Sequence, residues 1–262
     1  MPGSAELAAL ARVPDLARWV DTRGMLLSGF ARVRFSEPAD EYTDGFVVIL
    51  EPRALVSAVG RPPARLILDA AQRLPRADVL CPIEDVSHTS QALPEWRENC
   101  ALLHVLRGAM PWESEVDADT TIFVQDTTPS LSHLPEDLQR EIAEALRGMP
   151  LARFGDRIHA GRRLGPAPRP LPVAAVWADG LPVSFCYPVV QTETFWDISI
   201  DTLETYRGRG FAARAVRAMI RHMRRAGKAP VWGALETNTA SVAVARKLGF
   251  VEVGRLGVFT SR

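Results

Sequence analysis

A glycine-rich segment near the C-terminal end of the sequence has the composition of a phosphate-binding loop. It consists of Arg207-Gly208-Arg209-Gly210-Phe211-Ala212 and follows a β-rich run after a short loop. Glycine lets the backbone approach a ligand closely and turn successive N–H groups outward. A helix that begins at such a loop adds its own unpaired N–H groups and the positive end of its dipole. The segment predicts a phosphate or pyrophosphate site, with a tight turn before a solvated basic helix as the structural alternative.

Two other phosphate-binding loops do not fit this segment. The run from Gly208 to Ala213 matches the G-x-G-x-x-A form of the dinucleotide fingerprint, but Leu203–Tyr206 separate it from its strand. That fingerprint also needs an acidic residue about 20 positions later, and the corresponding region, Ala229-Pro230-Val231-Trp232, has none. The pattern G-x-x-x-x-G-K-[ST] does not occur in the sequence.

Hydrophobic patterns place the loop in a region of mixed α/β structure. Three β-rich runs precede it, and Ala178-Asp179-Gly180-Leu181 is typical of a hairpin turn between the first two. A helix from Phe211 to about residue 226 follows, with one apolar and one arginine-rich face. The expected strands here are Val173–Trp177, Val183–Val190, Phe195–Thr202, Val231–Leu235 and Phe250–Phe259, and the second expected helix is Ser241–Leu248.

The first half of the sequence also alternates between helical and strand patterns. The first 25 residues predict a helix interrupted by Pro14, and Pro94–Leu106 predict a helix that runs into a strand. Prolines at every second position of residues 166–172 predict an extended connector. Other expected elements are the strands Ala31–Phe35, Phe46–Glu51, Asp78–Ile83 and Thr120–Gln125, and the helices Pro63–Leu74 and Pro135–Arg147.

Composition limits the class of protein. The chain has 262 residues, 47% of them hydrophobic and 24% charged, which excludes a disordered or fibrous protein and fits one or two globular domains. The formal net charge is zero, but residues 203–262 hold 12 basic residues and three acidic ones. This local excess predicts a bound anion rather than general affinity for nucleic acid. With three widely spaced cysteines, and neither an apolar run long enough to span a membrane nor a signal sequence, we expect a cytoplasmic protein.

Two motifs together resemble the GNAT superfamily of acetyl-CoA-dependent N-acyltransferases. Arg207-x-x-Gly210-x-Ala212 fits the R/Q-x-x-G-x-G/A signature, and Asn238 to Phe250 fits N-x-x-S-x-x-x-A-x-K-L-G-F. Ile198–Thr202 with Pro230-Val231-Trp232 are most similar to the zwittermicin-resistance-like branch. The resemblance implies a mixed-sheet α/β GNAT fold over residues 118–262, and residues 1–117 predict an additional N-terminal α/β domain.

The resemblance also implies where acetyl-CoA binds. Its pyrophosphate is expected on backbone N–H groups of Arg207, Gly208, Arg209, Gly210, Phe211 and Ala212. Its pantetheine arm is expected beside Ile200, Asp201 and Thr202, where this strand splays from Val231–Leu235. Asn238 and Ser241 are expected to border the cofactor. The implied reaction is direct attack of an amine on the thioester, without a metal ion.

The catalytic groups depart from the pattern of the family. Many relatives carry a glutamate 13 residues before the signature arginine, where this chain has Thr194. The candidate bases are therefore Glu193 and Asp197, with Asp201 on the same strand. In a regular strand Asp197, Ser199 and Asp201 share one face. A capping or ion-pairing role for Asp197 or Asp201 is the structural alternative.

The general acid of the family is also missing from its usual position. Many relatives carry a tyrosine seven residues after the motif asparagine, and this chain has Ala245 there. Tyr187, Tyr206 or solvent are the substitutes, and Tyr206 is expected to pack at the loop. These departures keep a second class of function open, a non-catalytic acyl-CoA-binding or sensing module.

The expected acceptor is an amine of a small molecule or peptide. The acidic balance of residues 1–202 favours a cationic acceptor, while the basic C-terminal residues are expected to bind the cofactor phosphates. We expect neither nucleic acid nor a membrane as partner, and a homodimer is compatible with the sequence.

Overall fold

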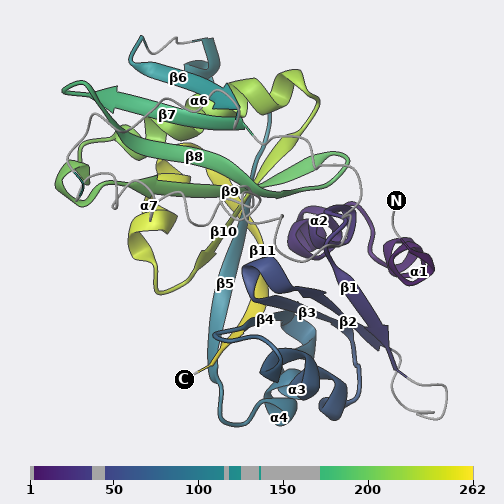
Figure 1. Cartoon of the computed structure of the whole chain (residues 1–262). Helices are drawn as coiled ribbons and strands as arrows, with labels where there is room; N and C mark the ends of the chain where they lie inside the picture. Colours follow the sequence, from purple (N-terminus) through teal and green to yellow (C-terminus); the bar gives the residue numbers. More distant parts are fainter. Residues whose placement is uncertain (1–2, 37–44, 115–117, 125–135, 137–171, 262) are drawn as a thin grey trace.

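The computed structural model describes residues 3–36, 45–114, 118–124, 136 and 172–261 (Figure 1). Its strands form one mixed sheet in the order β1-β2-β3-β4-β11-β5-β10-β9-β8-β7-β6. The mixed α/β class predicted from the sequence is confirmed. The strands are β1 Arg32–Phe35, β2 Gly45–Leu50, β3 Leu55–Gly60, β4 Asp78–Pro82, β5 Arg97–Leu106, β6 Thr120–Val124, β7 Pro172–Ala178, β8 Leu181–Gln191, β9 Phe195–Thr202, β10 Ala229–Leu235 and β11 Phe250–Thr260.

Helices cover both faces of this sheet. The α-helices of the described residues are α1 Ser4–Arg12, α2 Val20–Leu27, α3 Ala64–Gln72, α4 Val86–Ala92, α6 Phe211–Arg225 and α7 Thr239–Lys247. The predicted interruption of the first helix at Pro14 is present, since α1 and α2 lie on either side of it. The expected helix Pro135–Arg147 and the proline-rich connector lie almost entirely outside the described residues.

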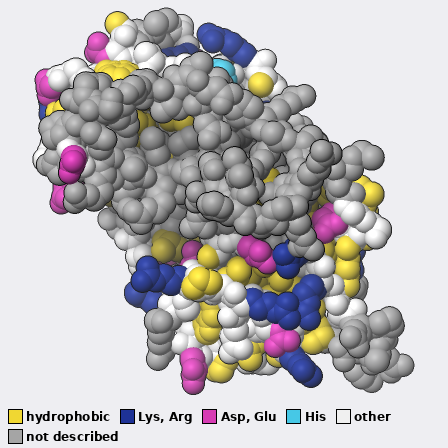
Figure 2. Space-filling model, viewed as in Figure 1, with side chains coloured by type: hydrophobic (Ala, Val, Ile, Leu, Met, Phe, Trp, Pro, Cys, Tyr) yellow, Lys and Arg dark blue, Asp and Glu magenta, His cyan; other side chains and the backbone are white. Residues whose placement is uncertain are grey.

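In the N-terminal half, helices pack on opposite faces of β1 to β4. The side chains of α3 share an apolar cluster with Val47 and Ile49 of β2. The side chains of α1 and α2 share another with Phe46 and Val48, which alternate with the first pair along the strand. On the face shown in Figure 2, basic and acidic side chains are interspersed over this half of the molecule.

The strands β6 to β9 form an antiparallel meander at the other end of the sheet (Figure 1). Asp179 and Gly180 connect β7 to β8 with φ angles of 53° and 77°. A two-residue hairpin turn of this kind requires left-handed backbone, which Asp and Gly tolerate. The hairpin predicted between these strands is therefore present.

An N-terminal strand lies inside the C-terminal part of the sheet. β5 is antiparallel to both of its neighbours, pairing Val105 with Val231 of β10 and with Val251 of β11. The expected helix before this strand is absent, and the segment is strand from Arg97 onward. Its apolar run is buried on both faces, which a central strand requires. The division of the chain at residue 117 remains a prediction, and the sheet itself extends across it.

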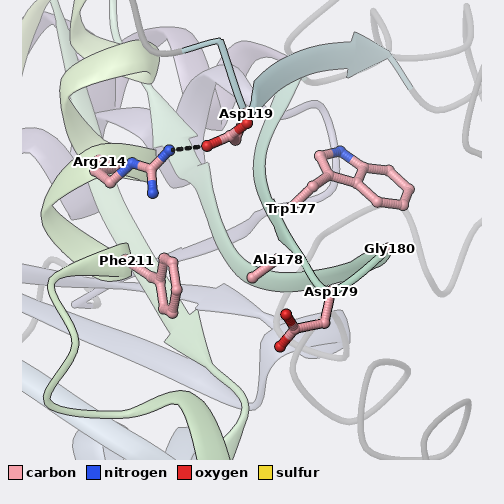
Figure 3. Close-up of a pocket in the computed structure, with 7 residues that line it drawn as sticks. All are labelled: Asp119, Trp177, Ala178, Asp179, Gly180, Phe211 and Arg214. Carbon is pink, nitrogen blue, oxygen red and sulfur yellow. Dashed lines mark hydrogen bonds and ion pairs between the residues drawn. The ribbon is translucent and has the colours of Figure 1, made fainter.

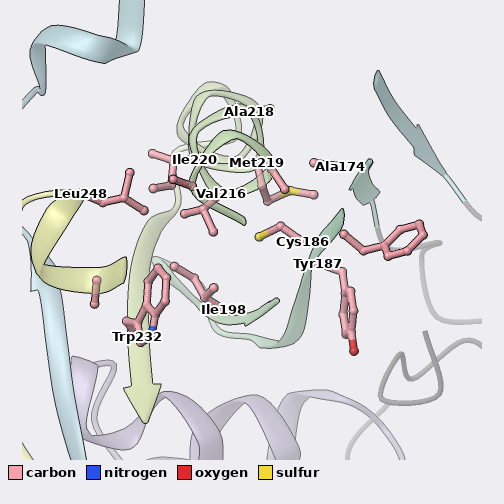
Figure 4. Packing of buried hydrophobic residues seen from close by; sticks show 14 of the residues in the cluster. Ala174, Cys186, Tyr187, Ile198, Val216, Ala218, Met219, Ile220, Trp232 and Leu248 are labelled. Atoms are coloured by element: carbon pink, nitrogen blue, oxygen red, sulfur yellow. The ribbon is translucent and has the colours of Figure 1, made fainter. Parts of the chain in front are cut away.

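The helix α6 covers the meander with its apolar face. Val216, Met219 and Ile220 are fully buried, as the helical periodicity predicted. Figure 4 shows them packed over Cys186 and Ile198 of the sheet. The same figure shows Tyr187 on the opposite side of β8 from Cys186, with its hydroxyl pointing away from α6. The other face of β8 and β9 is therefore open to groups from the N-terminal half.

Candidate active site

Two neighbouring parallel strands separate in the middle of the sheet. β9 and β10 pair at Phe195–Ala229, Trp196–Pro230 and Asp197–Val231, and no pairing continues beyond these positions. The other edge of β9 remains bonded to β8, where Ile200 faces Cys186 and Thr202 faces Ser184. The splay expected between these strands is therefore present. It leaves backbone N–H and C=O groups of Ile198–Thr202 directed at a space where an extended ligand can pair with them.

The glycine-rich loop follows the splayed end of β9 after a short helical turn, Glu204–Tyr206. Gly208 and Gly210 have φ angles of 74° and 86°, and Gly210 caps the N-terminus of α6. A Cβ atom built on either glycine meets no atom within 4 Å, so the loop surface is open. At the helix start, the Arg214 N–H donates to the Gly210 carbonyl at 3.3 Å. The N–H groups before it belong to the first turn, where a helix offers them no acceptor of its own, so they are suited to bind an anion.

Aromatic side chains surround the predicted anion site. The Arg209 guanidinium lies 5.2 Å from the Tyr206 ring centroid and 5.1 Å from that of Phe211. Tyr206 also donates a hydrogen bond to Asp179 at 3.3 Å. The expectation that Tyr206 packs at the loop agrees with these contacts. Arg207 donates from Nε to the Thr202 carbonyl at 3.1 Å and so ties the loop to the end of β9.

A pocket of about 350 Å³ lies beside the first turn of α6 (Figure 3). Phe211 and Arg214 form the helix side of it, and the β7–β8 turn forms the other. Arg214 donates to Asp119 at 3.0 Å across one end, as the figure shows. The pocket therefore adjoins the predicted pyrophosphate loop on the side away from the splay.

Several arginines of α6 bind protein groups rather than an open anion site. Arg224 forms a salt bridge with Glu113, and Arg221 donates to the Trp112 carbonyl at 3.5 Å. With the Arg214–Asp119 pair, these contacts hold the segment that follows β5 against the helix. The basic C-terminal residues are therefore only partly available for cofactor phosphates. The expectation that cofactor phosphates bind these basic residues therefore does not hold for Arg214, Arg221 and Arg224.

The second sequence motif forms the start of α7. The Asn238 side chain accepts a hydrogen bond from the Ser241 backbone N–H at 3.1 Å, a regular helix cap. The Ser241 hydroxyl accepts one from the Trp232 indole at 3.0 Å. Both side chains thus have partners within the protein, and their expected place beside the cofactor remains a prediction.

Asp197 lies where the two strands separate. Burial raises the pKa of this carboxyl well above its ordinary value, and the Asp21 carboxylate raises it further. Arg53 and the backbone N–H groups of Ile198 and Gly233 act in the opposite direction. A carboxylate with a raised pKa is a stronger base than an ordinary one, which suits a group that must take a proton.

Tyr187 faces the same side of the sheet as Asp197. It is opposite Ser199 in the β8–β9 ladder and is 1% exposed. Burial is the largest cause that raises the pKa of its hydroxyl, and a hydrogen bond with Ser199 partly offsets this. The hydroxyl therefore keeps its proton at neutral pH. Of the three predicted catalytic residues, the structure brings Asp197 and Tyr187 to one face.

Glu193 lies at the opposite end of β9 from the glycine-rich loop and binds Arg23 of α2. Arg23 donates to the two carboxylate oxygens at 2.7 Å and 2.6 Å. This hydrogen-bonded ion pair lowers the pKa of Glu193, which disfavours it as a base. The neighbouring Thr194 donates from its N–H and hydroxyl to Asp15. The β8–β9 turn is therefore a docking point for the N-terminal helices.

We expect replacement of Arg23 by Ala to lower the free energy of unfolding by about 2–4 kcal/mol, since its removal leaves several partners unpaired. Arg23 also donates to the carbonyls of Leu10 and Val13, and 16% of its side chain is exposed. Glu193→Gln is expected to cost less, because 49% of the Glu193 side chain is exposed. Urea unfolding of both variants and the double variant measures their coupling, and additive effects would contradict a direct interaction.

Two residues of this face were missed by the sequence analysis. Asp21 of α2 and Arg53, which lies between β2 and β3, act on the pKa of Asp197, and Arg53 also acts on that of Tyr187. Burial raises the pKa of Asp21 itself to about 6, against the opposing effect of Arg53. No motif marks either residue, because only the tertiary fold brings them to β9.

The splayed strands and the glycine-rich loop at a helix N-terminus define an acyltransferase fold. Residues 174–259 match the sequence model of the GNAT acetyltransferase family. This part of the chain is therefore similar to the GNAT acetyltransferase family, and the resemblance found in the sequence is confirmed. No functionally curated protein matches the sequence significantly.

Solved structures of GNAT proteins share the fold over most of the chain. A GCN5-related N-acetyltransferase-like protein from Streptococcus suis is 14% identical, with a TM-score of 0.65 and coverage of 98% of both chains. A GCN5-related N-acetyltransferase from Kribbella flavida is 14% identical, with a TM-score of 0.55, covering 100% of this chain and 96% of its own. A putative GNAT-family acetyltransferase from Novosphingobium aromaticivorans is 17% identical, with a TM-score of 0.54, covering 82% and 86%. The GNAT fold with an additional N-terminal part is thereby shown.

The described residues lack two kinds of feature. No helix in the described part of the chain is long and apolar enough to cross a membrane. Residues 3–36, 45–114, 118–124, 136 and 172–261 contain no group of three His, Cys, Asp or Glu side chains that could hold a metal ion.

Proposed function

We propose that this protein is an N-acetyltransferase that transfers the acetyl group of acetyl-CoA to an amine of a small molecule or peptide. The observation that carries the proposal is the splay of β9 from β10, which a short turn connects to the glycine-rich loop. The loop and the start of α6 offer N–H groups for a pyrophosphate. The free edge of β9 offers backbone groups for a pantetheine arm, which leads the thioester toward Asp197.

In this proposal the amine nitrogen attacks the thioester carbonyl carbon, and the carbon–sulfur bond then breaks. Asp197 takes a proton from the ammonium, which gives the neutral amine. A backbone N–H on the free edge of β9 donates to the carbonyl oxygen as it becomes negative. Tyr187 gives a proton to the leaving thiolate, and the second amine proton returns the hydroxyl to its starting state. The net products are the amide, the free thiol and one proton.

We expect Asp197→Asn to lower kcat for amine-dependent thiol release by about 10²- to 10⁴-fold, the usual contribution of a general base. Asn has nearly the same shape and cannot take the proton. The assay combines acetyl-CoA with a panel of primary amines and follows free thiol. Asp69→Asn on α3 serves as the matched control, since Asp69 belongs to a helix on the other face of the N-terminal half. An unchanged kcat for Asp197→Asn would exclude this residue as the base.

The non-catalytic alternative makes the opposite prediction in the same assay. An acyl-CoA-binding module binds acetyl-CoA in calorimetry but releases no thiol when any amine is added. Amine-dependent release above the rate without amine therefore separates the two functions.

A further inference from the structure

Gly233 is an exposed glycine in an interior strand of the sheet. It belongs to β10, where its sequence neighbours Trp232 and Ala234 are both buried. On one side β10 is paired with β5, and Gly233 is opposite Leu103. On the other side Gly233 lies two residues beyond Val231, the last residue of β10 that pairs with β9. Gly233 is therefore located where the two strands have separated.

Position 233 faces the same side of the sheet as Asp197. Val231 is the partner of Asp197, and side chains alternate along a strand, so residues 231 and 233 share the face of that carboxyl group. A Cβ atom built on Gly233 would lie 3.9 Å from Oδ1 of Asp197. Asp197 is itself partly exposed. The space that a side chain at position 233 would fill therefore lies directly beside this carboxyl oxygen.

Packing accounts for other glycines of the protein but not for this one. A Cβ atom on Gly24 would lie 2.6 Å from Cβ of Val190, and one on Gly257 would lie 2.5 Å from Cγ2 of Val86. At Gly233 the nearest atom outside its chain neighbours would be 3.8 Å away, an ordinary van der Waals distance, and its φ is not left-handed. Glycine inside a strand is destabilising relative to alanine. Gly233 therefore weakens the sheet although neither packing nor backbone conformation requires it.

The rest of the surroundings is apolar. The atom 3.8 Å from the Cβ position is Cδ2 of Leu103. Leu235, two residues further along β10, is half-buried and packs against the same apolar cluster as Val231 and Leu103. A ligand group beside Gly233 thus meets one carboxyl group and hydrocarbon side chains, which suits an amine with a hydrocarbon substituent.

We propose that Gly233 lines the acceptor site and that its missing side chain leaves room for a primary amine beside Asp197. The inference rests on the proposed acetyl transfer and adds to it a residue that limits the size of the acceptor next to its nitrogen. A hydrogen bond from an ammonium to a carboxylate is about 2.8 Å long. Since Oδ1 of Asp197 is 3.9 Å from the Cβ position, an amine bonded to this oxygen from the open side fills the space that a larger side chain would take.

A structural requirement for glycine is the competing explanation, and stability separates the two. Alanine fits the space at position 233 and reduces the conformational freedom of the unfolded chain. We therefore expect Gly233→Ala to have a higher urea midpoint than the wild type. A lower midpoint would show that the fold needs glycine here and would overturn the inference.

The main test measures amine-dependent thiol release from acetyl-CoA by the full-length protein. The probes are propylamine and isopropylamine, which differ only in branching at the carbon next to nitrogen. We expect Gly233→Val to lower kcat/KM for propylamine by about tenfold or more, the effect of a misfit of one or a few carbon atoms in an apolar site. Gly233→Ala takes up less of the space, so it should lower kcat/KM for isopropylamine more than for propylamine.

Gly254 on β11 provides the matched control. It pairs with Leu103 from the side opposite Gly233, and a Cβ atom there would also meet no atom within 4 Å. Gly254→Val adds the same bulk away from Asp197 and should leave kcat/KM for propylamine unchanged. Calorimetry of acetyl-CoA should give the same Kd for the wild type and Gly233→Val. An unchanged kcat/KM in Gly233→Val, or an equal loss of acetyl-CoA affinity, overturns the inference and leaves acetyl transfer in place.

A wild type that releases no thiol with either amine would remove the proposed function, and binding then decides the inference. Calorimetry of the full-length protein, saturated with CoA, gives Kd for propylamine. Weaker binding to Gly233→Val than to both the wild type and Gly254→Val retains the amine site. Equal binding to the three proteins, or no binding to the wild type, overturns it.

Discussion

A fragment of residues 118–262 is expected not to fold, although it contains the whole match to the GNAT family. The fragment lacks β5, which separates β10 from β11 and pairs with both. Without it, β10 keeps only its short parallel pairing with β9. Leu102, Leu103 and Leu106 also leave the core, and each buried Leu contributes about 1.5–3 kcal/mol. This loss is comparable to the total stability of about 5–15 kcal/mol of a typical domain.

Circular dichroism and urea unfolding of the fragment measure this effect. A full-length chain with an inserted protease site at residue 116, cleaved after purification, provides the matched control, because it has the same break in the chain but retains β5. We expect the cleaved protein to unfold cooperatively and the fragment to show no cooperative transition. Cooperative unfolding of the isolated fragment would establish residues 118–262 as an independent domain.

The position of β5 could not be predicted from the sequence, for a physical reason. Hydrophobic periodicity reports which faces of a segment are buried, and both faces of β5 carry buried apolar side chains, such as Leu102 on one and Leu103 on the other. It does not report which strands lie on either side. The hairpin at Asp179-Gly180 was predictable because its residues interact within a few positions of one another.

In the candidate site, too, only the residues that lie close together in the sequence were predictable. The glycine-rich loop and the splayed strand form one local stretch, so their motif indicated both the fold and the cofactor. The acidic face instead joins Asp197 to Asp21 and Arg53 of the N-terminal half. The Arg23–Glu193 pair is another contact between distant parts of the sequence, since its partners are 170 residues apart. Nothing in the sequence marked Glu193 as a docking residue rather than a base.

Gly210 connects the sequence motif to a measurable property of the loop. Its φ of 86° is left-handed, and a Cβ atom there would meet no protein atom within 4 Å. Asn and Asp tolerate this conformation better than other residues and both favour helix N-caps. Gly210→Asn and Gly210→Asp are therefore expected to fold, with similar costs in stability. They differ only in the negative charge that Asp places at the proposed pyrophosphate site.

We expect Gly210→Asp to weaken acetyl-CoA binding by about 100-fold or more, since a carboxylate close to the pyrophosphate repels its charge where helix N–H groups should attract it. Gly210→Asn adds the same bulk without the charge, so its Kd should fall between those of the wild type and Gly210→Asp.

Gly227 at the other end of α6 is the matched control, because its φ is 74° and its surroundings are equally open. Gly227→Asp should bind acetyl-CoA as the wild type does. Calorimetry at low and high ionic strength decides the cause, because the difference between the Asp and Asn variants at position 210 should shrink as salt screens the repulsion. Equal affinities for these two variants at low salt would place the pyrophosphate elsewhere.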